Sequence, residues 1–291
     1  MSIVRIATRA SALARWQAEH VAGLLVAAVA DLEIEVVPLS TEGDRRTDLP
    51  LSEIGGKGVF ATEVQQALLD GRADIAVHSA KDLPAATPSE LVIAAIPQRG
   101  DARDALVGGT LADLREGAMV ATGSARRRAL LADLRPDLEF AELRGNMATR
   151  LSKAADFDAI VVAGVALERL GLAEQIDDWL DTETFVPQVA QAALAVECRA
   201  GDSDTRGLLG LIDDAESRRR VMAERDFLVE LGGDCSLPAG AHAVIGDSGE
   251  LVLRAVLADS PGGHLVRGQL SSVESVNPGG ELAIKLRALL G

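Results

Sequence analysis

Aromatic, cysteine and histidine side chains are scarce in this sequence. Five Phe, two Trp and no Tyr make up 2% of its 291 residues, which is too few for a site built from stacked rings. Two cysteines, Cys198 and Cys235, cannot form a disulfide framework, and the four histidines are scattered. Without a CxxC pair or a histidine cluster we expect no metal site. The same cysteine usage predicts a reduced, cytoplasmic protein.

Positive charge is also in deficit. The 29 Lys and Arg residues stand against 44 Asp and Glu residues, which gives a net charge of −15. Binding to nucleic acid needs a basic face that displaces counterions from phosphates, so no nucleic-acid partner is expected. The deficit is uneven, because residues 118–170 hold eight basic and seven acidic side chains, a net of +1, which leaves −16 for the rest. A local site for a small anion is therefore compatible with the composition.

No apolar run is long enough to span a bilayer, so no membrane partner is expected either. Residues 21–30 resemble the end of a secretory signal, but Glu19 and His20 directly precede them. Apolar residues recur at helical spacing through this region. A buried helix that begins after Ser11 is therefore the better interpretation.

Short runs rich in Val and Ile alternate with helical patterns through the first two thirds of the chain. The expected strands are Ile3–Ala7, Ile34–Leu39, Ile75–Val77, Leu91–Ile96, Met119–Ala121 and Ala159–Ala163. The helical patterns cover residues 12–30, 59–70, 125–134 and 147–155. This alternation predicts α/β domains, in which helices cover both faces of parallel sheets. Residues 73–79 and 157–163 both run from an acidic residue into a buried strand, which fits two similar domains.

Changes in the pattern predict three domains. Residues 97–103 interrupt the apolar pattern, and residues 187–196 are typical of a return crossing. After about residue 215 a charged helix leads to three strand-like runs, separated by the turn sequences GDSGE and DSPGGH. The last domain is thus expected to be a small α+β domain with a three-stranded antiparallel sheet. The expected domains are residues 1–97 with about 194–212, residues 101–190, and residues 215–291.

Basic side chains gather in two segments in the middle of the chain, residues 122–128 and 144–150. Residues 122–128 read TGSARRR at a strand-to-helix junction, where free N–H groups and the helix dipole favour a bound anion. A solvated arginine run on a helix would explain the tripeptide Arg126-Arg127-Arg128 as well. Residues 144–146 read RGN, and Arg150 follows. These residues favour the anion site, because a glycine after an arginine lets the backbone approach a ligand closely.

A carboxylate and a lysine follow the strand at residues 75–77. Lys81 and Asp82 offer charge neutralisation and proton transfer beyond the carboxyl end of this strand, where ligands bind in open α/β sheets. A surface turn with an incidental ion pair is the alternative. His78 continues the apolar strand pattern and is predicted to be a core residue.

Two further segments are ambiguous by themselves. The loop around Lys57 reads GGKG and lacks the spacing of a Walker loop, so it indicates a flexible loop with one cation. Cys198 lies in a strand-like run and is predicted to be buried. Cys235 lies in a loop of small residues, where the thiol is either inert or a covalent attachment point.

Taken together, these segments resemble the hydroxymethylbilane synthase family, also called the porphobilinogen deaminases, over almost the whole chain. The motifs are Arg9-Ala-Ser11 with Trp16-Gln17, Gly55-Gly-Lys57-Gly-Val-Phe60, His78-Ser-Ala-Lys-Asp82-Leu-Pro84, Thr122-Gly-Ser124-Ala-Arg126-Arg127, Arg144-Gly-Asn146, Arg150, Arg169-Leu-Gly171, Glu197-Cys-Arg199, Ala223-Glu-Arg225 and the Cys235 loop. The succession of HSxKDLP, TxSxRR and RGN is highly specific. The resemblance implies two domains like those of periplasmic binding proteins, and a third that carries a cofactor loop.

The resemblance also implies an activity. This family of transferases joins four porphobilinogen molecules head to tail with loss of ammonia and releases hydroxymethylbilane by hydrolysis, a step of porphyrin and heme biosynthesis. Its cofactor is a dipyrromethane, and the resemblance implies a thioether link to Cys235. The expected partners are porphobilinogen and the growing oligopyrrole chain, bound by a monomer.

The residues expected to act are those that match the family motifs. Asp82 is the expected catalytic residue. The expected cofactor contacts, besides Cys235, are Ser79, Lys81, Thr122, Ser124, Arg126, Arg127, Arg144 and Asn146. The expected substrate contacts are Arg9, Ser11, Gln17, Lys57, Arg144, Arg150 and Arg169, and Phe60 is expected near the cofactor.

The sequence departs from the family pattern at the return crossing. Ala190 and Ala192 stand where the family has glycines, and alanine disfavours a positive φ at both positions. A non-catalytic, anion-binding solute receptor of similar fold is the alternative function. That alternative explains the arginines but gives Lys81, Asp82 and Cys235 no joint purpose.

Overall fold

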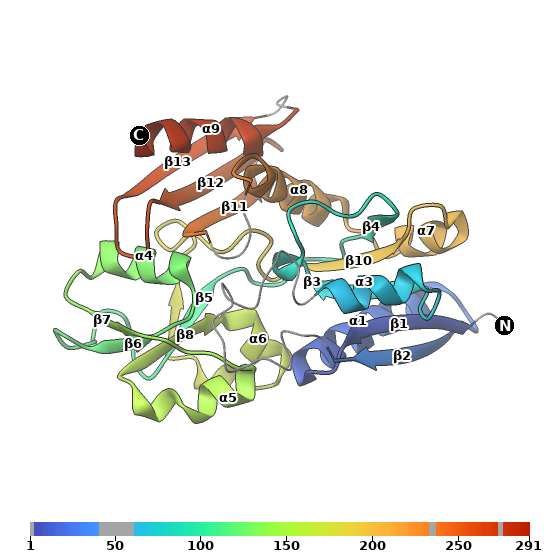
Figure 1. Cartoon of the computed structure of the whole chain (residues 1–291), viewed down its shortest axis with the longest axis horizontal. Helices are drawn as coiled ribbons and strands as arrows, with labels where there is room; N and C mark the ends of the chain where they lie inside the picture. The colour runs from blue at the N-terminus through green and yellow to red at the C-terminus, as the bar shows by residue number, and fades with distance from the viewer. Residues whose placement is uncertain (1–2, 41–60, 233–236, 273–275) are drawn as a thin grey trace. The chain divides into compact units, whose positions relative to one another are not determined.

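The described part of the chain forms three β-sheets. A computed structural model describes residues 3–40, 61–232, 237–272 and 276–291 (Figure 1). The chain divides into two compact units, residues 1–100 with 192–219 and residues 101–191 with 220–291. None of the helices in the described ranges is both long and apolar enough to cross a membrane.

The first unit is built on a five-stranded sheet of order β2-β1-β3-β10-β4. Its strands are β1 (Ile3–Arg9), β2 (Glu33–Leu39), β3 (Ile75–Ser79), β4 (Leu91–Ala95) and β10 (Leu194–Arg199). Its helices are α1 (Ala12–Ala28), α3 (Thr62–Leu69), α7 (Ser203–Gly210) and the 3-10 turn η1 (Ala80–Asp82). β1 pairs in parallel with β2 and β3, whereas β10 runs antiparallel to β3 and β4.

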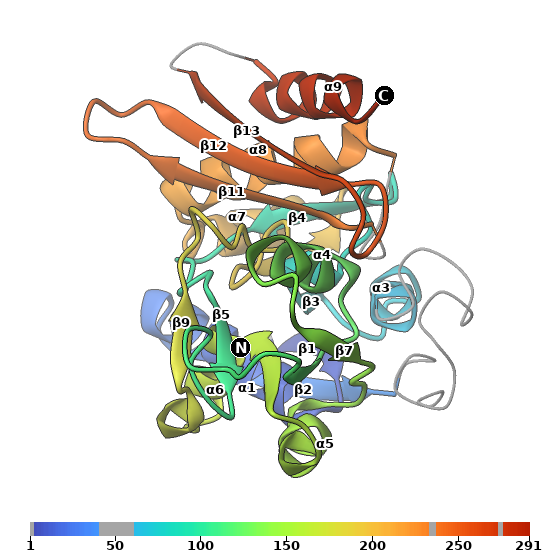
Figure 2. The same cartoon turned by 90° about the vertical axis from the view of Figure 1, so that its left-hand side faces the viewer.

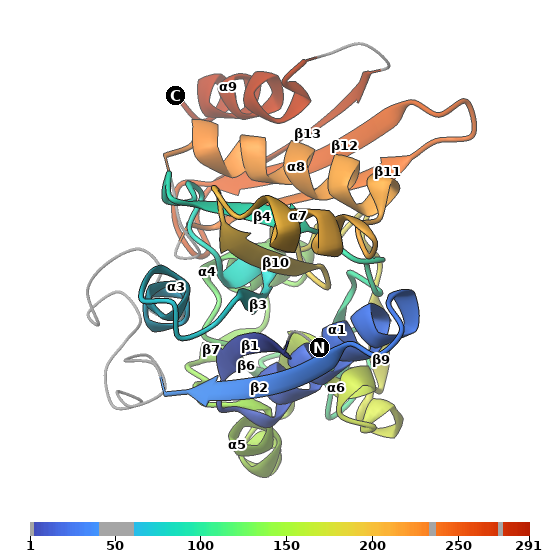
Figure 3. The same cartoon turned by 90° about the vertical axis from the view of Figure 1, so that its right-hand side faces the viewer.

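Both faces of this sheet are apolar, as the sequence predicted. Ile6 and Ile75 pack with α1, and their neighbours Ala7 and Ala76 pack with α3. The two helices lie on opposite faces of the sheet (Figure 3). Successive residues of a strand point to opposite faces, so continuous apolar runs are needed where helices cover both. Ser11 starts α1 as predicted, because its Oγ accepts a hydrogen bond from the Ala14 N–H at 3.3 Å.

The second unit holds another five-stranded sheet, of order β7-β6-β8-β5-β9. Its strands are β5 (Asp104–Val107), β6 (Met119–Ala121), β7 (Glu139–Ala141), β8 (Ala159–Ala163) and β9 (Asp178–Leu180). Its helices are α4 (Ala125–Leu134), α5 (Met147–Ser152) and α6 (Gly164–Arg169). Leu130 of α4 packs with Val161 on one face, and Leu167 of α6 packs with Ile160 on the other.

The two five-stranded sheets share one topology. Each sheet has one antiparallel strand, β10 in the first and β5 in the second. Among the remaining strands of each sheet, the first lies between the second and the third, and the antiparallel strand separates the third from the fourth. The likeness extends to side chains: Asp74 accepts a hydrogen bond from the Arg5 N–H at 2.9 Å, and Asp158 accepts one from the Met119 N–H at 2.8 Å. Residues 73–79 and 157–163 are therefore structural counterparts, as the sequence predicted.

The third sheet is antiparallel and three-stranded, as the C-terminal turn sequences predicted. Its strands are β11 (Ala239–Ile245), β12 (Leu251–Ala258) and β13 (Leu265–Ser272), with helices α8 (Ala215–Glu230) and α9 (Pro278–Leu290) nearby (Figure 2). A Cβ at Gly268 would lie 2.8 Å from Leu286 of α9, so glycine permits the close packing of helix on sheet. The fold class is therefore the expected one: two similar α/β sheets and a small α+β part.

Candidate active site

Polar residues gather at the carboxyl edge of the first sheet. β1 and β3 are parallel neighbours in the register Ile6 to Ile75, so their carboxyl ends meet at one edge. Gln17 of α1 is 3% exposed, and its Nε2 donates to Ser79 Oγ at 2.8 Å. The structure thereby brings six of the predicted residues to this edge, namely Arg9, Ser11, Gln17, Ser79, Lys81 and Asp82.

Asp82 lies in the 3-10 turn η1, directly after β3. Its Oδ2 is 3.9 Å from Arg9 Nη1, and its side chain is 33% exposed. At this distance the carboxylate and the guanidinium form an ion pair but no hydrogen bond. The carboxylate is thus oriented by a cation and still accessible to a small molecule.

A buried network holds β3 just before this turn. Glu197 on β10 is fully buried, and both of its carboxylate oxygens accept from Gln65 Nε2, at 3.1 and 2.9 Å. His78 is 7% exposed, and its Nε2 lies 3.1 Å from Glu197 Oε2. His78 is therefore a core residue, as the sequence predicted, and the network fixes the strand that leads to Ser79.

The carboxyl edge of the second sheet carries the TGSARRR segment. The Ser124 N–H donates to Thr122 Oγ1 at 3.2 Å, and Ser124 Oγ accepts from the Arg127 N–H at 3.4 Å. Ser124 is thus the N-cap of α4. Thr122 is only 1% exposed, so its hydroxyl shapes the turn from within.

Arg126 and Arg127 are buried rather than solvated. Both form salt bridges with Asp104 on β5, at 2.7 Å each, and Asp104 is fully buried. Burial alone would raise the pKa of Asp104, but the two guanidiniums hold it well below its usual range. Sequence reasoning missed Asp104, because a lone acid 22 residues before its partner leaves no local pattern. We call Asp104, Arg126 and Arg127 the arginine cluster.

The RGN segment is a tight turn followed by α5. Asn146 Oδ1 accepts from the Thr149 N–H at 3.0 Å, and Arg150 Nε donates to the Gly145 carbonyl at 2.9 Å. Gly145 has φ +113°, and a Cβ there would lie 2.7 Å from Thr149, so the turn requires glycine. Arg144 Nη1 is buried without a hydrogen-bond partner among the described residues. It can donate to a ligand without losing an existing bond.

The remaining predicted residues divide into two groups. Arg169 ends α6, and burial lowers its pKa to about 10, so it still carries its charge at neutral pH. Cys198 is fully buried as predicted, and burial raises the pKa of its thiol to about 11. Lys57, Phe60 and Cys235 lie outside the described residues.

The return crossing adopts the backbone that alanine disfavours. Ala190 has φ +58° and Ala192 has φ +69°, so the sequence-based preference is overridden at both positions. The Ala190 N–H donates to Glu224 Oε2 at 2.7 Å, and Gln191 Nε2 donates to the Ala102 carbonyl at 2.8 Å and to Asp104 Oδ1 at 2.9 Å. These buried bonds hold the segment in the left-handed conformation.

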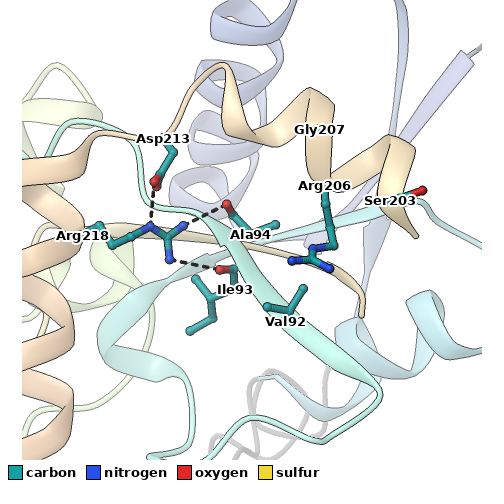
Figure 4. A pocket seen from close by; sticks show the side chains of 8 residues that line it. All are labelled: Val92, Ile93, Ala94, Ser203, Arg206, Gly207, Asp213 and Arg218. Atoms are coloured by element: carbon teal, nitrogen blue, oxygen red, sulfur yellow. Dashed lines mark hydrogen bonds and ion pairs between the residues drawn. The ribbon is translucent and has the colours of Figure 1, made fainter. Parts of the chain in front are cut away.

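A hollow of about 580 Å³ lies on β4, two strands away from β3 (Figure 4). Arg218 reaches across it and donates to the carbonyls of Ile93 and Ala94, at 3.3 and 2.9 Å, and to Asp213 at 2.7 Å. β4 is an edge strand, and a side chain that binds its carbonyls prevents further strands from pairing there. We therefore infer that Arg218 protects the edge of the sheet here, and that this hollow is not part of the active site.

Comparison with known sequences identifies the same family at both ends of the chain. Residues 4–207 match the domain described as "Porphobilinogen deaminase, dipyromethane cofactor binding domain". Residues 218–290 match the domain described as "Porphobilinogen deaminase, C-terminal domain". A curated relative, the porphobilinogen deaminase of Syntrophotalea carbinolica, is 44% identical over 276 residues, which cover 93% of this chain and 87% of the relative.

Two solved structures show distant similarity. A nutrient binding protein from Burkholderia cenocepacia has a TM-score of 0.43 at 14% identity, covering 78% of this chain and 95% of its own. The periplasmic aliphatic sulphonate binding protein SsuA of Escherichia coli has a TM-score of 0.41 at 18% identity, covering 80% of this chain and 71% of its own. Similarity at this level does not identify a ligand. The sequence matches do, however, span nearly the whole chain, and they show that it belongs to the porphobilinogen deaminase family.

Proposed function

We propose that Asp82 is the catalytic carboxylate with which this chain carries out the reaction of its family. That reaction, hydroxymethylbilane synthesis, condenses four porphobilinogen molecules head to tail with loss of ammonia. The observation that carries the proposal is the position of Asp82, at the carboxyl edge of β3, 3.9 Å from Arg9 and accessible to a small molecule. The family match at both ends of the chain leaves no support for the alternative of a non-catalytic receptor.

The chemistry of ammonia loss fits a carboxylate at this place. A proton must reach the amine nitrogen of porphobilinogen before ammonia leaves, and the remaining methylene-pyrrolenine is a cation. An anionic oxygen near the pyrrole nitrogen stabilises this cation and then accepts the proton that is lost after coupling. Arg9 holds the Asp82 carboxylate in place without a hydrogen bond that would have to break.

The residues of the second unit fit the dipyrromethane cofactor. When bound, this group supplies the pyrrole to which the first substrate is joined. Its acetate and propionate groups require cationic and hydroxyl donors, and Arg144 has a buried Nη1 for which the described residues provide no acceptor. We assign its contacts to Thr122, Ser124, Arg126, Arg127, Arg144 and Asn146 of the second unit, and to Ser79 and Lys81 of the first.

Cys235 is the proposed attachment point of the cofactor. The chain has only one other cysteine, Cys198, which is fully buried on β10. Burial raises the pKa of that thiol to about 11, so almost none of it is the reactive thiolate at neutral pH. β11 begins at Ala239, four residues after Cys235. At Gly240 of this strand a Cβ would lie 2.9 Å from Arg126 Cδ, so β11 itself packs closely against Arg126.

The remaining assignments concern the substrate and the organisation of the chain. Each pyrrole adds two carboxylates, and we assign them to Arg9, Ser11, Gln17, Lys57, Arg144, Arg150 and Arg169. We infer three domains, residues 1–97 with about 194–212, residues 101–190, and residues 215–291. We also infer that the chain works as a monomer in the cytoplasm, as the resemblance to its family implies.

The test is incubation of the purified chain with porphobilinogen, followed by intact-protein mass and an Ehrlich-type colour reaction for pyrroles. A covalent adduct of two porphobilinogen units in the resting protein, further increments during turnover and a coloured product are expected. An unmodified chain that stays colourless after incubation would show that the proposed function is wrong.

A further inference from the structure

Asp104 is the centre of a buried charge cluster to which the reaction assigns no role. It lies at the first position of β5, and its side chain is fully buried. Its Oδ1 accepts from Nε and Nη2 of Arg127, at 3.0 and 2.7 Å, and from Gln191 Nε2 at 2.9 Å. Its Oδ2 accepts from Nη2 of Arg126 at 2.7 Å. Four hydrogen bonds thus converge on a single carboxylate.

The arginine cluster carries a net positive charge. Two guanidiniums, 2% and 5% exposed, share the single carboxylate of Asp104, which leaves a net charge of +1. A buried charge is costly unless a partner compensates it. A ligand carboxylate is a partner of opposite charge, and a guanidinium presents up to five N–H donors to it.

The N–H groups of Arg126 and Arg127 that do not bind Asp104 are fixed in direction. Arg126 Nη1 donates to the Val186 carbonyl at 2.7 Å, and Arg127 Nη1 donates to the Val161 carbonyl at 2.9 Å. Arg126 Nε is buried and has no hydrogen-bond partner among the described residues. Since each guanidinium is held by Asp104 on one side and by a backbone carbonyl on another, its remaining N–H groups cannot swing freely.

We propose that Asp104 is a positioning residue for the reaction: it fixes Arg126 and Arg127 so that the arginine cluster binds one carboxylate of the dipyrromethane or of the growing chain. This inference rests on the proposed function. Asp104 touches neither ligand nor reacting atoms, and it acts through the two arginines.

Two variants and a control test the role of Asp104. Asp104→Asn removes the charge but keeps the size, and Asp104→Glu keeps the charge but displaces it by one methylene. Asp137→Asn is the matched control, because Asp137 pairs with Arg135 at the same distance of 2.7 Å in the same unit but lies outside the site. Each protein is purified and its folding is checked by circular dichroism. Its cofactor content is then measured by intact mass, and KM and kcat for porphobilinogen are measured separately.

A positioning role predicts a specific pattern. Both Asp104 variants, where folded, should lose cofactor content or raise KM by about tenfold or more, as expected when hydrogen bonds to a charged group are misplaced. The kcat of the loaded fraction should change much less, and Asp137→Asn should match the wild type. A folded Asp104→Asn or Asp104→Glu chain with normal cofactor content and normal KM would overturn the proposal.

A structure of the wild-type holoenzyme decides the matter if neither variant folds. The proposal expects a ligand carboxylate within about 3.2 Å of an Arg126 or Arg127 nitrogen, while Asp104 keeps both salt bridges. Ligand carboxylates held entirely by other residues would overturn it. Failure of the proposed function itself is distinguishable, since the wild type would then lack both the covalent adduct and turnover.

Discussion

Replacement of Asp82 by asparagine separates catalysis from stability. The carboxylate is one third exposed and meets its cationic neighbour Arg9 only at 3.9 Å. An ion pair of this kind contributes at most about 1 kcal/mol to folding, so Asp82→Asn should unfold close to the wild-type temperature. A positioned proton-transfer group contributes a rate factor of about 10² to 10⁴, and kcat should fall by that amount. Asparagine keeps the size of the side chain but cannot carry the proton or stabilise the cation.

The assay follows ammonia release and pyrrole colour at saturating porphobilinogen, with thermal unfolding and intact mass measured on the same samples. Asp70→Asn is the matched control, because Asp70 is also a partly exposed carboxylate of the first unit, paired with Arg72 at 3.3 Å. The control should keep its turnover. Near-normal turnover in Asp82→Asn, with the cofactor bound, would remove Asp82 from the mechanism.

Three further predictions concern the second unit, the crossing and the response to acid. Arg144→Ala should lower kcat/KM by about 10- to 100-fold, because a hydrogen bond to a ligand carboxylate is lost. The unfolding temperature should change little, because the buried Nη1 of Arg144 has no hydrogen-bond partner among the described residues. Unchanged kinetics would contradict the assignment of Arg144. Ala190→Gly should be less destabilising than Ala193→Gly by about 1–2 kcal/mol in denaturant unfolding. Both alanines are buried, but of these two only Ala190 has a positive φ, which glycine adopts without strain. Equal losses of unfolding free energy would contradict backbone strain at Ala190. The depressed pKa of Asp104 means that its contribution to stability is present above the unfolded value of about 3.9 and lost as the pH falls through the folded value. The unfolding free energy should therefore decline with pH below about 4, and a flat acid limb in pH-dependent unfolding would refute this coupling.

The sequence predicted those parts of the fold that repeat a local pattern. Continuous apolar runs identified β1, β3 and β8, and the N-cap at Ser11 marked the start of α1. The likeness of residues 73–79 and 157–163 identified the internal repeat. The short strands β5 and β9 were missed, because both begin with an acidic residue and their pairing is set by partners distant in sequence.

The site was predictable where one segment carried the chemistry. Residues 78–84 contain both the buried strand end and the acid, so Asp82 could be placed beyond the strand from the sequence alone. Asp104 could not be found in this way, because its partners lie on α4, and only the fold brings them within 2.7 Å. The positive φ of Ala190 and Ala192 was unpredictable for the same reason. Tertiary hydrogen bonds to Glu224 and from Gln191 override the local preference of alanine there.

Attachment of the dipyrromethane to Cys235 is the proposed step on which all later condensations depend. Intact mass of Cys235→Ser and Cys198→Ser, each purified from cells that make porphobilinogen, tests it most directly. Cys198→Ser should carry the adduct of two porphobilinogen units, since the Cys198 thiol is fully buried and burial raises its pKa to about 11, and Cys235→Ser should carry none. An adduct that persists in Cys235→Ser and disappears in Cys198→Ser would contradict it.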